Sequence, residues 1–263
     1  MLADSLLAAH LLGLDQVANE TGRAIEFADP VQMSFDLAPQ EAIDYFRRKK
    51  VITRKKFDKL ADDARSAAFT VSSVYKKDLL EGFKEEIAKS LEEGPPQRQV
   101  IKRFKEILDG AGHKQLGAYH LETIFRVNMA MSYGVARRRG LEAAAEDLPY
   151  WEYHSVGDDR VRQTHQVLNG MILPASHDFW RDHFPPWEFA CRCSVTAIAS
   201  MPNGYNHASP SGEGTVYYDE RGNPAKAEIG TSVYDLAADG KFQGVPPQGG
   251  LREAIENGVR RSQ

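Results

Sequence analysis

The two cysteines of the chain are the residues whose spacing most clearly suggests chemistry. Cys191 and Cys193 are separated by a single residue. On an extended segment, residues i and i+2 face the same side, so both sulfur atoms could bind one metal ion, whereas a disulfide across so small a ring would be strained. Zinc usually takes four ligands, and the candidates for the others are His165, His177 and His183. The alternative is that both cysteines are small buried hydrophobic residues.

A second group of polar residues lies in the segment 158–165. It combines two carboxylates, two guanidinium groups and an imidazole, from Asp158, Asp159, Arg160, Arg162 and His165. These groups could carry acid–base or phosphate chemistry, or they could form the capped, salt-bridged start of a helix. The chain has no nucleophile elbow, phosphate-binding glycine loop or His-Glu-x-x-His motif. We therefore predict that it is not an enzyme; the alternative is a metal-assisted hydrolase or transferase using Asp159, Arg160 and His165.

A dense basic run occupies residues 47–56. Seven of its ten positions are cations: Arg47, Arg48, Lys49, Lys50, Arg54, Lys55 and Lys56. Such a run could contact the phosphates of double-stranded DNA, with salt-dependent affinity. The alternative is a solvated junction between helices.

The elements that must position these residues follow from hydrophobic periodicity. Apolar residues at helical spacing predict a helix after the N-cap Thr53 up to Val71, and further helices over 73–91, 100–110 and 114–139. Arg137, Arg138 and Arg139 fall in the last turn of the longest helix, where cations suit the negative end of the helix dipole. Beyond Pro149 the predicted elements are shorter: strands over 151–156, 171–173 and 194–198, and short helices over 158–168 and from Asp178.

These elements predict an α+β fold, with a mainly helical N-terminal half, a small α+β module and an irregular C-terminal tail. The expected domains are an N-terminal helical arm over 1–35, a helical domain over 36–148, a compact module with the Cys-x-Cys pair over 149–200, and a Gly/Pro-rich tail over 201–263 that includes a weak helix over 251–260. We expect Trp151, Trp180 and Trp187 to form the core of the module rather than a ligand cage.

Composition excludes several classes of protein. Of 263 residues, 42% are hydrophobic, which suffices for a folded core, and 33 basic against 37 acidic side chains argue against a polycationic nucleic-acid binder. Two cysteines exclude a multi-disulfide scaffold. No apolar run reaches the roughly 18 to 20 residues of a membrane span, and the apolar segment 6–14 lacks the basic start of a secretory signal. We therefore expect a soluble chain that does not contact membranes.

An ordered series of motifs resembles the phage Mu F-like head morphogenesis family. The series runs through roughly residues 35–200 and comprises Ala68-Phe69-Thr70-Val71, Glu122-Thr123-Ile124-Phe125-Arg126-Val127-Asn128, Asp159-Arg160-Val161-Arg162-Gln163-Thr164-His165, Leu168-Asn169-Gly170, Phe179-Trp180, Pro185-Pro186 and Cys191-Arg192-Cys193. The resemblance implies a minor head protein of a tailed phage or prophage. It would associate with portal, scaffold or major capsid proteins and with packaged DNA, in the host cytoplasm during assembly and later in the virion.

The resemblance also bears on the metal. Some relatives look as if they carry Cys-x-x-Cys in the aspartate segment and a histidine shortly before the Cys-x-Cys, a pattern that would complete a zinc site. The matching positions here are Arg162, His165 and Glu188. His165, Cys191 and Cys193 are therefore the expected zinc ligands, and an Arg162–Glu188 ion pair is the hypothesis for what replaces the others. Together with Asp159 and Arg160, this pair would form a polar network that stabilises the module.

Overall fold

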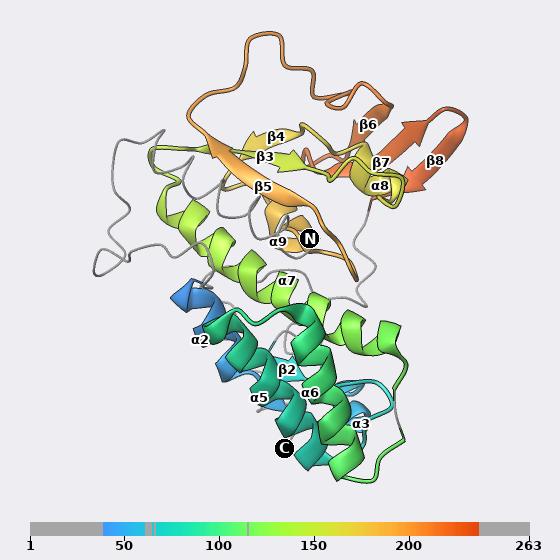
Figure 1. Ribbon diagram of the computed structural model, residues 1–263. Coiled ribbons are helices and arrows are strands. Elements are labelled where there is room, and N and C mark those ends of the chain that lie inside the picture. Colours follow the sequence, from blue (N-terminus) through green and yellow to red (C-terminus); the bar gives the residue numbers. More distant parts are fainter. Residues whose placement is uncertain (1–38, 61–64, 66, 115, 237–263) are drawn as a thin grey trace. The chain divides into compact units, whose positions relative to one another are not determined.

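The computed structural model describes residues 39–60, 65, 67–114 and 116–236 (Figure 1). These residues divide into two compact units, a helical unit over 39–136 and a sheet unit over 137–236. Helices dominate the first and short strands the second, so the predicted α+β class is confirmed. The predicted helical arm over 1–35 and the helix over 251–260 lie outside the described residues. Within the described part, no helix is long and apolar enough to span a membrane.

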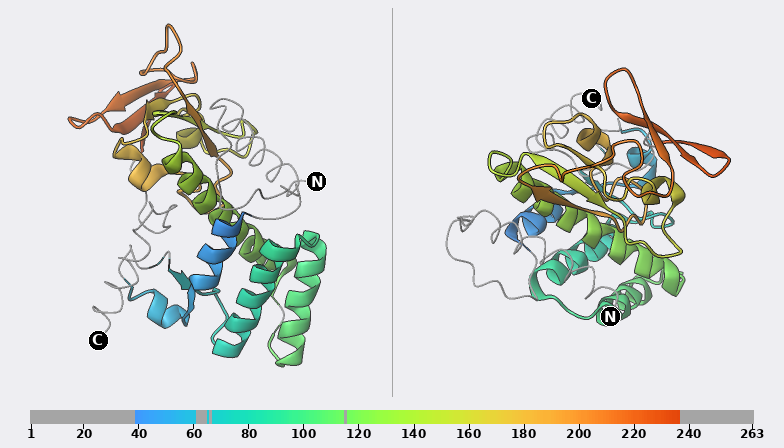
Figure 2. Two further views of the ribbon diagram at one scale, coloured as in Figure 1. Left: turned by 90° about the vertical axis from the view of Figure 1, so that its left-hand side faces the viewer. Right: turned by 90° about the horizontal axis from the view of Figure 1, so that it is seen from above.

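The helical unit is built from four longer helices. These are α2 (Gln40–Arg48), α5 (Lys77–Glu93), α6 (Gln97–Gly110) and the first part of α7 (Ala118–Ala143). Helices α5 and α6 lie side by side in both views of Figure 2, and the rings of Phe83 and Phe104 meet between them with centroids 4.4 Å apart. Helix α5 ends at Gly94 in the left-handed conformation, before two prolines that cannot continue it. The helices predicted over 73–91 and 100–110 are confirmed, although α5 begins four residues late.

The helix predicted from Thr53 to Val71 is wrong over the described residues 58–60 and 67–71. Helix α3 (Arg54–Phe57) forms at its start and Arg65 is also helical, whereas β2 (Ala68–Phe69) pairs in parallel with β1 (Lys50–Val51) near its end. The amide of Lys50 donates to the carbonyl of Ala67, 2.8 Å away, and tertiary pairing of this kind overrides a helical pattern. The β-branched pair that follows Phe69 also favours an extended backbone.

The predicted end of the longest helix is also wrong. Helix α7 continues through Gly140 to Ala143, and Arg137 and Arg138 are buried instead of capping it. Arg137 Nε donates to the carbonyl of Val195, and Arg138 Nη1 donates to the carbonyl of Trp180 at 2.7 Å. These arginines therefore fix the last turns of α7 to the rest of the sheet unit.

The sheet unit contains a three-stranded antiparallel sheet in the order β4-β3-β5 (Figure 1). Its strands are β3 (Tyr150–His154), β4 (Ile172–Pro174) and β5 (Ser194–Ile198), close to the predicted ranges. Two short helices, α8 (Gln163–Gln166) and α9 (Phe179–His183), accompany it. The three tryptophans are each 1% exposed, and the rings of Trp151 and Trp180 lie 5.6 Å apart, so the prediction that they form the core is confirmed.

A second antiparallel sheet occurs where no strand was predicted. Strands β6 (Thr215–Tyr218), β7 (Pro224–Ile229) and β8 (Ser232–Asp235) follow one another through two tight turns. Gly222 and Gly230 take positive φ values in those turns. Hydrophobic patterning missed the sheet because β8 is largely exposed and lacks the alternation of a half-buried strand.

Candidate metal centre

The metal candidates are brought together by a short helix and a tight turn. His165 lies in α8, while Cys191 and Cys193 lie between a turn and the start of β5. The amide of Cys191 donates to the carbonyl of Glu188 at 3.0 Å, which closes the turn. Ala190 takes a φ of 58° inside it. The chain is thereby reversed just before the strand, and both sulfur atoms face α8.

The ring nitrogen Nδ1 of His165 faces both sulfur atoms. It lies 3.6 Å from Cys191 Sγ and 3.4 Å from Cys193 Sγ, and one ligand atom from each residue falls within 4.8 Å of the others. A tetrahedral zinc ion with ordinary bond lengths separates a nitrogen from a sulfur ligand by about 3.6 Å. The donor set and its spacing therefore fit Zn²⁺. Among the histidines considered from sequence, the structure selects His165.

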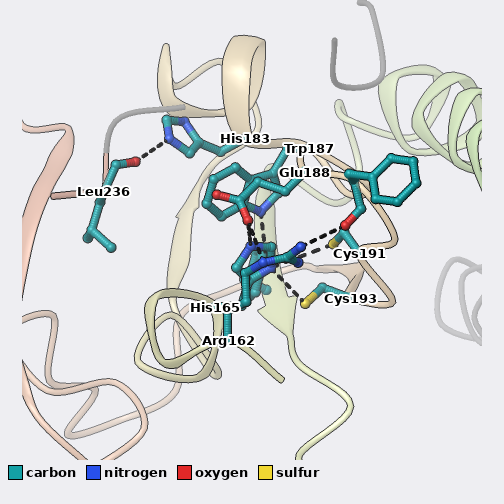
Figure 3. A network of polar contacts seen from close by, with 10 residues as sticks. Arg162, His165, His183, Trp187, Glu188, Cys191, Cys193 and Leu236 are labelled. Atoms are coloured by element: carbon teal, nitrogen blue, oxygen red, sulfur yellow. Dashed lines mark hydrogen bonds and ion pairs between the residues drawn. The ribbon is translucent and has the colours of Figure 1, made fainter. Parts of the chain in front are cut away.

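Glu188 and Trp187 fix the orientation of the His165 ring, and Arg162 holds Glu188, as Figure 3 shows. Its Nε2 lies 3.1 Å from Glu188 Oε2, and its ring stacks on Trp187 with centroids 4.2 Å apart and an interplanar angle of 7°. Glu188 Oε2 in turn lies 3.0 Å from Arg162 Nε. The hypothesised Arg162–Glu188 pair is thus present in the geometry, and it contacts the imidazole on the side away from the sulfur atoms.

Tyr153 is a member of this cluster that the sequence did not single out. Its Oη lies 3.1 Å from His165 Nδ1 and accepts a hydrogen bond from Trp187 Nε1 at 2.9 Å. Burial raises the pKa of the phenol well above its ordinary value, and the neighbouring thiols raise it further. The sequence indicates its position through the alternation along β3, which buries Trp151 and Tyr153. A buried tyrosine hydroxyl needs a polar partner, so Tyr153 could have been expected to join a polar cluster.

The two thiols differ in their electrostatics. Burial works against ionisation of Cys191, but hydrogen bonds with Cys193 and His165 hold the pKa of its thiol well below the usual value. A hydrogen bond with Cys191, together with burial, raises the pKa of Cys193. The pair therefore stabilises one thiolate charge readily and a second one poorly, unless a cation binds between them.

The other two histidines considered as ligands make different contacts. His183 Nε2 lies 2.7 Å from the carbonyl oxygen of Leu236, and its ring stacks on Phe179. His177 Nδ1 accepts a hydrogen bond from the amide of Phe179 at 3.2 Å. These ring nitrogens therefore bond to backbone groups away from the two sulfur atoms.

The aspartate segment is arranged differently from either expectation. Asp158 binds both terminal nitrogens of Arg192 at 2.5 and 2.6 Å, which lowers the pKa of its carboxyl to about 2. The predicted helix over 158–168 shrinks to α8, with Arg162 rather than an aspartate as the N-cap residue. Asp159 and Arg160 are exposed, whereas His165 is buried, so the three do not form a common site. The ion pair that joins this segment to the Cys-x-Cys turn is Asp158–Arg192.

The basic run does not present one continuous positive surface. Arg47 pairs with Glu92 at 2.5 Å and with Glu85 at 3.3 Å. Arg48 pairs with Asp44, and Arg54 pairs with Asp58. Lys49 is buried. The remaining cations of the run are exposed: Lys50, Lys55 and Lys56. Contact with DNA stays a prediction, and those three exposed lysines are the residues that would support it.

Ala190 offers a direct test of how the turn holds the cysteines. An L-residue in the left-handed region costs about 1–2 kcal/mol, whereas glycine adopts it freely and loses roughly 0.5–1 kcal/mol through its more flexible unfolded state. We expect Ala190→Gly to raise the free energy of unfolding by up to about 1 kcal/mol in urea titrations. Ala175→Gly, at a position with negative φ, should lower it; a loss of stability in both variants would contradict the assigned turn.

The sequence of this chain is similar to proteins of a known family. Residues 81–196 match the family model described as Phage Mu protein F like protein. The chain is 33% identical over 192 residues to the putative capsid assembly protein F of Escherichia phage Mu, covering 64% of this chain and 44% of that protein. It is 30% identical over 167 residues to the Mu-like prophage FluMu F protein of Haemophilus influenzae, covering 58% and 40%.

A weaker match extends to an archaeon. An uncharacterized protein of Methanocaldococcus jannaschii is 25% identical over 152 residues, which cover 56% of this chain and 21% of that protein. No solved structure gives a significant match. The chain spans less than half the length of these curated relatives, and the matched region runs from α5 into β5, so it contains Tyr153, His165 and both cysteines. Residues 81–196 of this chain are therefore similar to the Phage Mu protein F like family, the family that the ordered motifs resemble.

Proposed function

We propose that the chain acts in phage head morphogenesis as a minor head protein of a tailed phage or prophage. The observation that carries this proposal is the family match over 81–196, which takes in helices of the helical unit and, in the sheet unit, β3, β4 and the Cys-x-Cys turn before β5. One relative with 33% identity is named a putative capsid assembly protein. The chain would be present in the host cytoplasm during assembly and then in the head.

The partners in this proposal are other head proteins, namely portal, scaffold or major capsid subunits. Two large tyrosines support a contact surface on the helical unit: Tyr75 is 72% exposed and Tyr119 is 82% exposed. Lys76 Nζ donates to the carbonyl of Ala111 at 3.4 Å, which brings the segment before α5 to the loop that leads into α7. Tyrosine is enriched in the buried centres of protein interfaces.

The test is to delete the chain from the phage or prophage that encodes it and to restore it from a plasmid. We expect deletion to reduce the yield of filled heads, counted by electron microscopy, and the restored chain to be found in purified heads by mass spectrometry. Normal heads without the chain, or its absence from procapsids and heads, would overturn the proposal.

The exposed tyrosines give a sharper prediction. Tyr75→Ser combined with Tyr119→Ser is expected to lower incorporation into heads at least about tenfold, because truncating interface anchors typically costs 2 kcal/mol or more of binding. The melting temperature should stay unchanged, since both side chains face solvent. Tyr217→Ser, at a tyrosine that is 46% exposed in the sheet unit, is the matched control. Equal incorporation of all variants would remove this surface from the proposal.

We also propose that the sheet unit holds one Zn²⁺ ion through His165, Cys191 and Cys193. The spacing of their donor atoms supports this site. The bound ion would cross-link α8 to the start of β5, and small folding units commonly need such a cross-link because their cores are limited. Elemental analysis of chain expressed with added zinc should give one zinc per chain; less than a tenth of an equivalent would reject the site.

A further inference from the structure

The proposed zinc site has three protein donors, whereas structural zinc sites normally have four. The fourth position decides whether the site is closed by the protein or open to solvent and exogenous ligands. Glu188 lies at Nε2 of His165, whereas the phenol oxygen of Tyr153, which is completely buried, lies at Nδ1, the nitrogen that faces both sulfur atoms.

The Arg162–Glu188 pair determines which nitrogen of His165 faces the cluster. A guanidinium stays protonated, so the Glu188 carboxylate beside it is suited to accept the Nε2–H of the imidazole. In the neutral ring this leaves a lone pair on Nδ1, the atom that faces both sulfur atoms and Tyr153. Carboxylates play this orienting role behind histidine ligands of metal ions. Glu188 and Arg162 are thus positioning residues for the site.

The position of the phenol matches what a fourth ligand requires. In a tetrahedral zinc site a nitrogen and an oxygen ligand are separated by about 3.4 Å. Tyr153 Oη lies 3.1 Å from Nδ1 of His165 and is held by the indole N–H of Trp187, which occupies one of its lone pairs. The same N–H would stabilise a negative oxygen. Arg192 places a further positive charge near both sulfur atoms.

We propose that Tyr153 is the fourth zinc ligand, so that the site is closed by His165 Nδ1, Cys191 Sγ, Cys193 Sγ and Tyr153 Oη. The inference rests on the proposed zinc site and adds to it. On binding, the phenol O–H bond breaks, its proton passes to solvent, and the oxygen lone pair forms the bond to zinc. A closed site of this kind stabilises the fold and leaves no position for a substrate or water.

The experiment uses the full chain, stripped of metal with a chelator and titrated with Zn²⁺ and then Co²⁺. We expect a tyrosinate difference band in the ultraviolet that saturates at one equivalent of Zn²⁺. In Tyr153→Phe this band should disappear and zinc affinity should fall at least about tenfold. The Co²⁺ spectrum of that variant should then change on addition of azide or imidazole, whereas that of the wild type should not.

Tyr205→Phe is the matched control, because Tyr205 is a half-buried tyrosine of the same unit whose hydroxyl contacts the amide of Ile172 instead. It should keep both the band and the affinity. If the wild type binds one zinc without a tyrosinate band, Tyr153 is not a ligand although the zinc site stands. If the wild type binds no zinc, both proposals fail. The wild-type band decides the question even if Tyr153→Phe does not fold.

Discussion

Replacing Cys191 and Cys193 together by serine is expected to abolish stoichiometric zinc binding and to destabilise the sheet unit strongly. A ligand that binds only the folded state at a free concentration a thousandfold above its Kd contributes about 4 kcal/mol. For a unit of this size that corresponds to a fall in Tm of roughly 15 to 30 °C. The measurement is differential scanning calorimetry of zinc-loaded chains with elemental analysis of the same samples.

The matched control is His207→Asn, which changes an exposed histidine of the same unit that lies outside the cluster. It should keep its zinc and its Tm, and a chelator should reduce the Tm of the wild type to that of the double-serine variant. If instead the Tm is unchanged in the double-serine variant and insensitive to chelator, the Arg162–Glu188–His165 network stabilises this region without metal.

Lys49→Met is expected to raise the stability of the chain at neutral pH by at most about 4 kcal/mol, reduced by the cation–π contact with the Tyr45 ring that the substitution removes. Lys49 is buried beside the ring of Tyr45, and burial lowers the pKa of its ammonium group to about 7. Between pH 10.5 and 7 the unfolded chain therefore takes up a proton that the folded chain does not, so stability is lost as pH falls through this range. Methionine fills a similar volume without a charge.

The measurement is urea unfolding at pH 7, 8 and 9. The advantage of Lys49→Met over the wild type should shrink by about 1.4 kcal/mol for each pH unit. Lys50→Met, at the exposed neighbour, should follow the wild-type pH dependence. An advantage of Lys49→Met that does not change with pH would show that the ammonium group stays charged in the folded state.

Local periodicity was sufficient to predict the elements whose own residues form their contacts. Helix α5 buries Leu80, Phe83 and Ile87 at helical spacing and stops at Gly94, and both features are visible in the sequence. The strand over 194–198 was predicted with its observed bounds. Ligand types and spacing left His165, His177 and His183 open as partners of Cys191 and Cys193, and the resemblance to the Mu F-like family pointed to His165.

Features that depend on distant partners were missed for a physical reason. Ala68 and Phe69 form a strand because their backbone pairs with that of Lys50 and Val51. Such pairing with a distant segment cannot be predicted from the local sequence pattern. Arg137 and Arg138 are buried because carbonyls of Val195 and Trp180 accept their hydrogen bonds. Tyr153 joins the cysteine cluster for the same kind of reason, since its strand places its hydroxyl against residues far along the chain.

The two buried arginines at the end of α7 also determine how the protein can be divided for study. A fragment that starts at Pro149, where composition changes, would lose the donors for the Val195 and Trp180 carbonyls and the guanidinium that lies 5.2 Å from the ring of Phe184. Buried carbonyls without donors are costly. An expressible fragment of the sheet unit must therefore begin upstream of Arg137, within α7 itself.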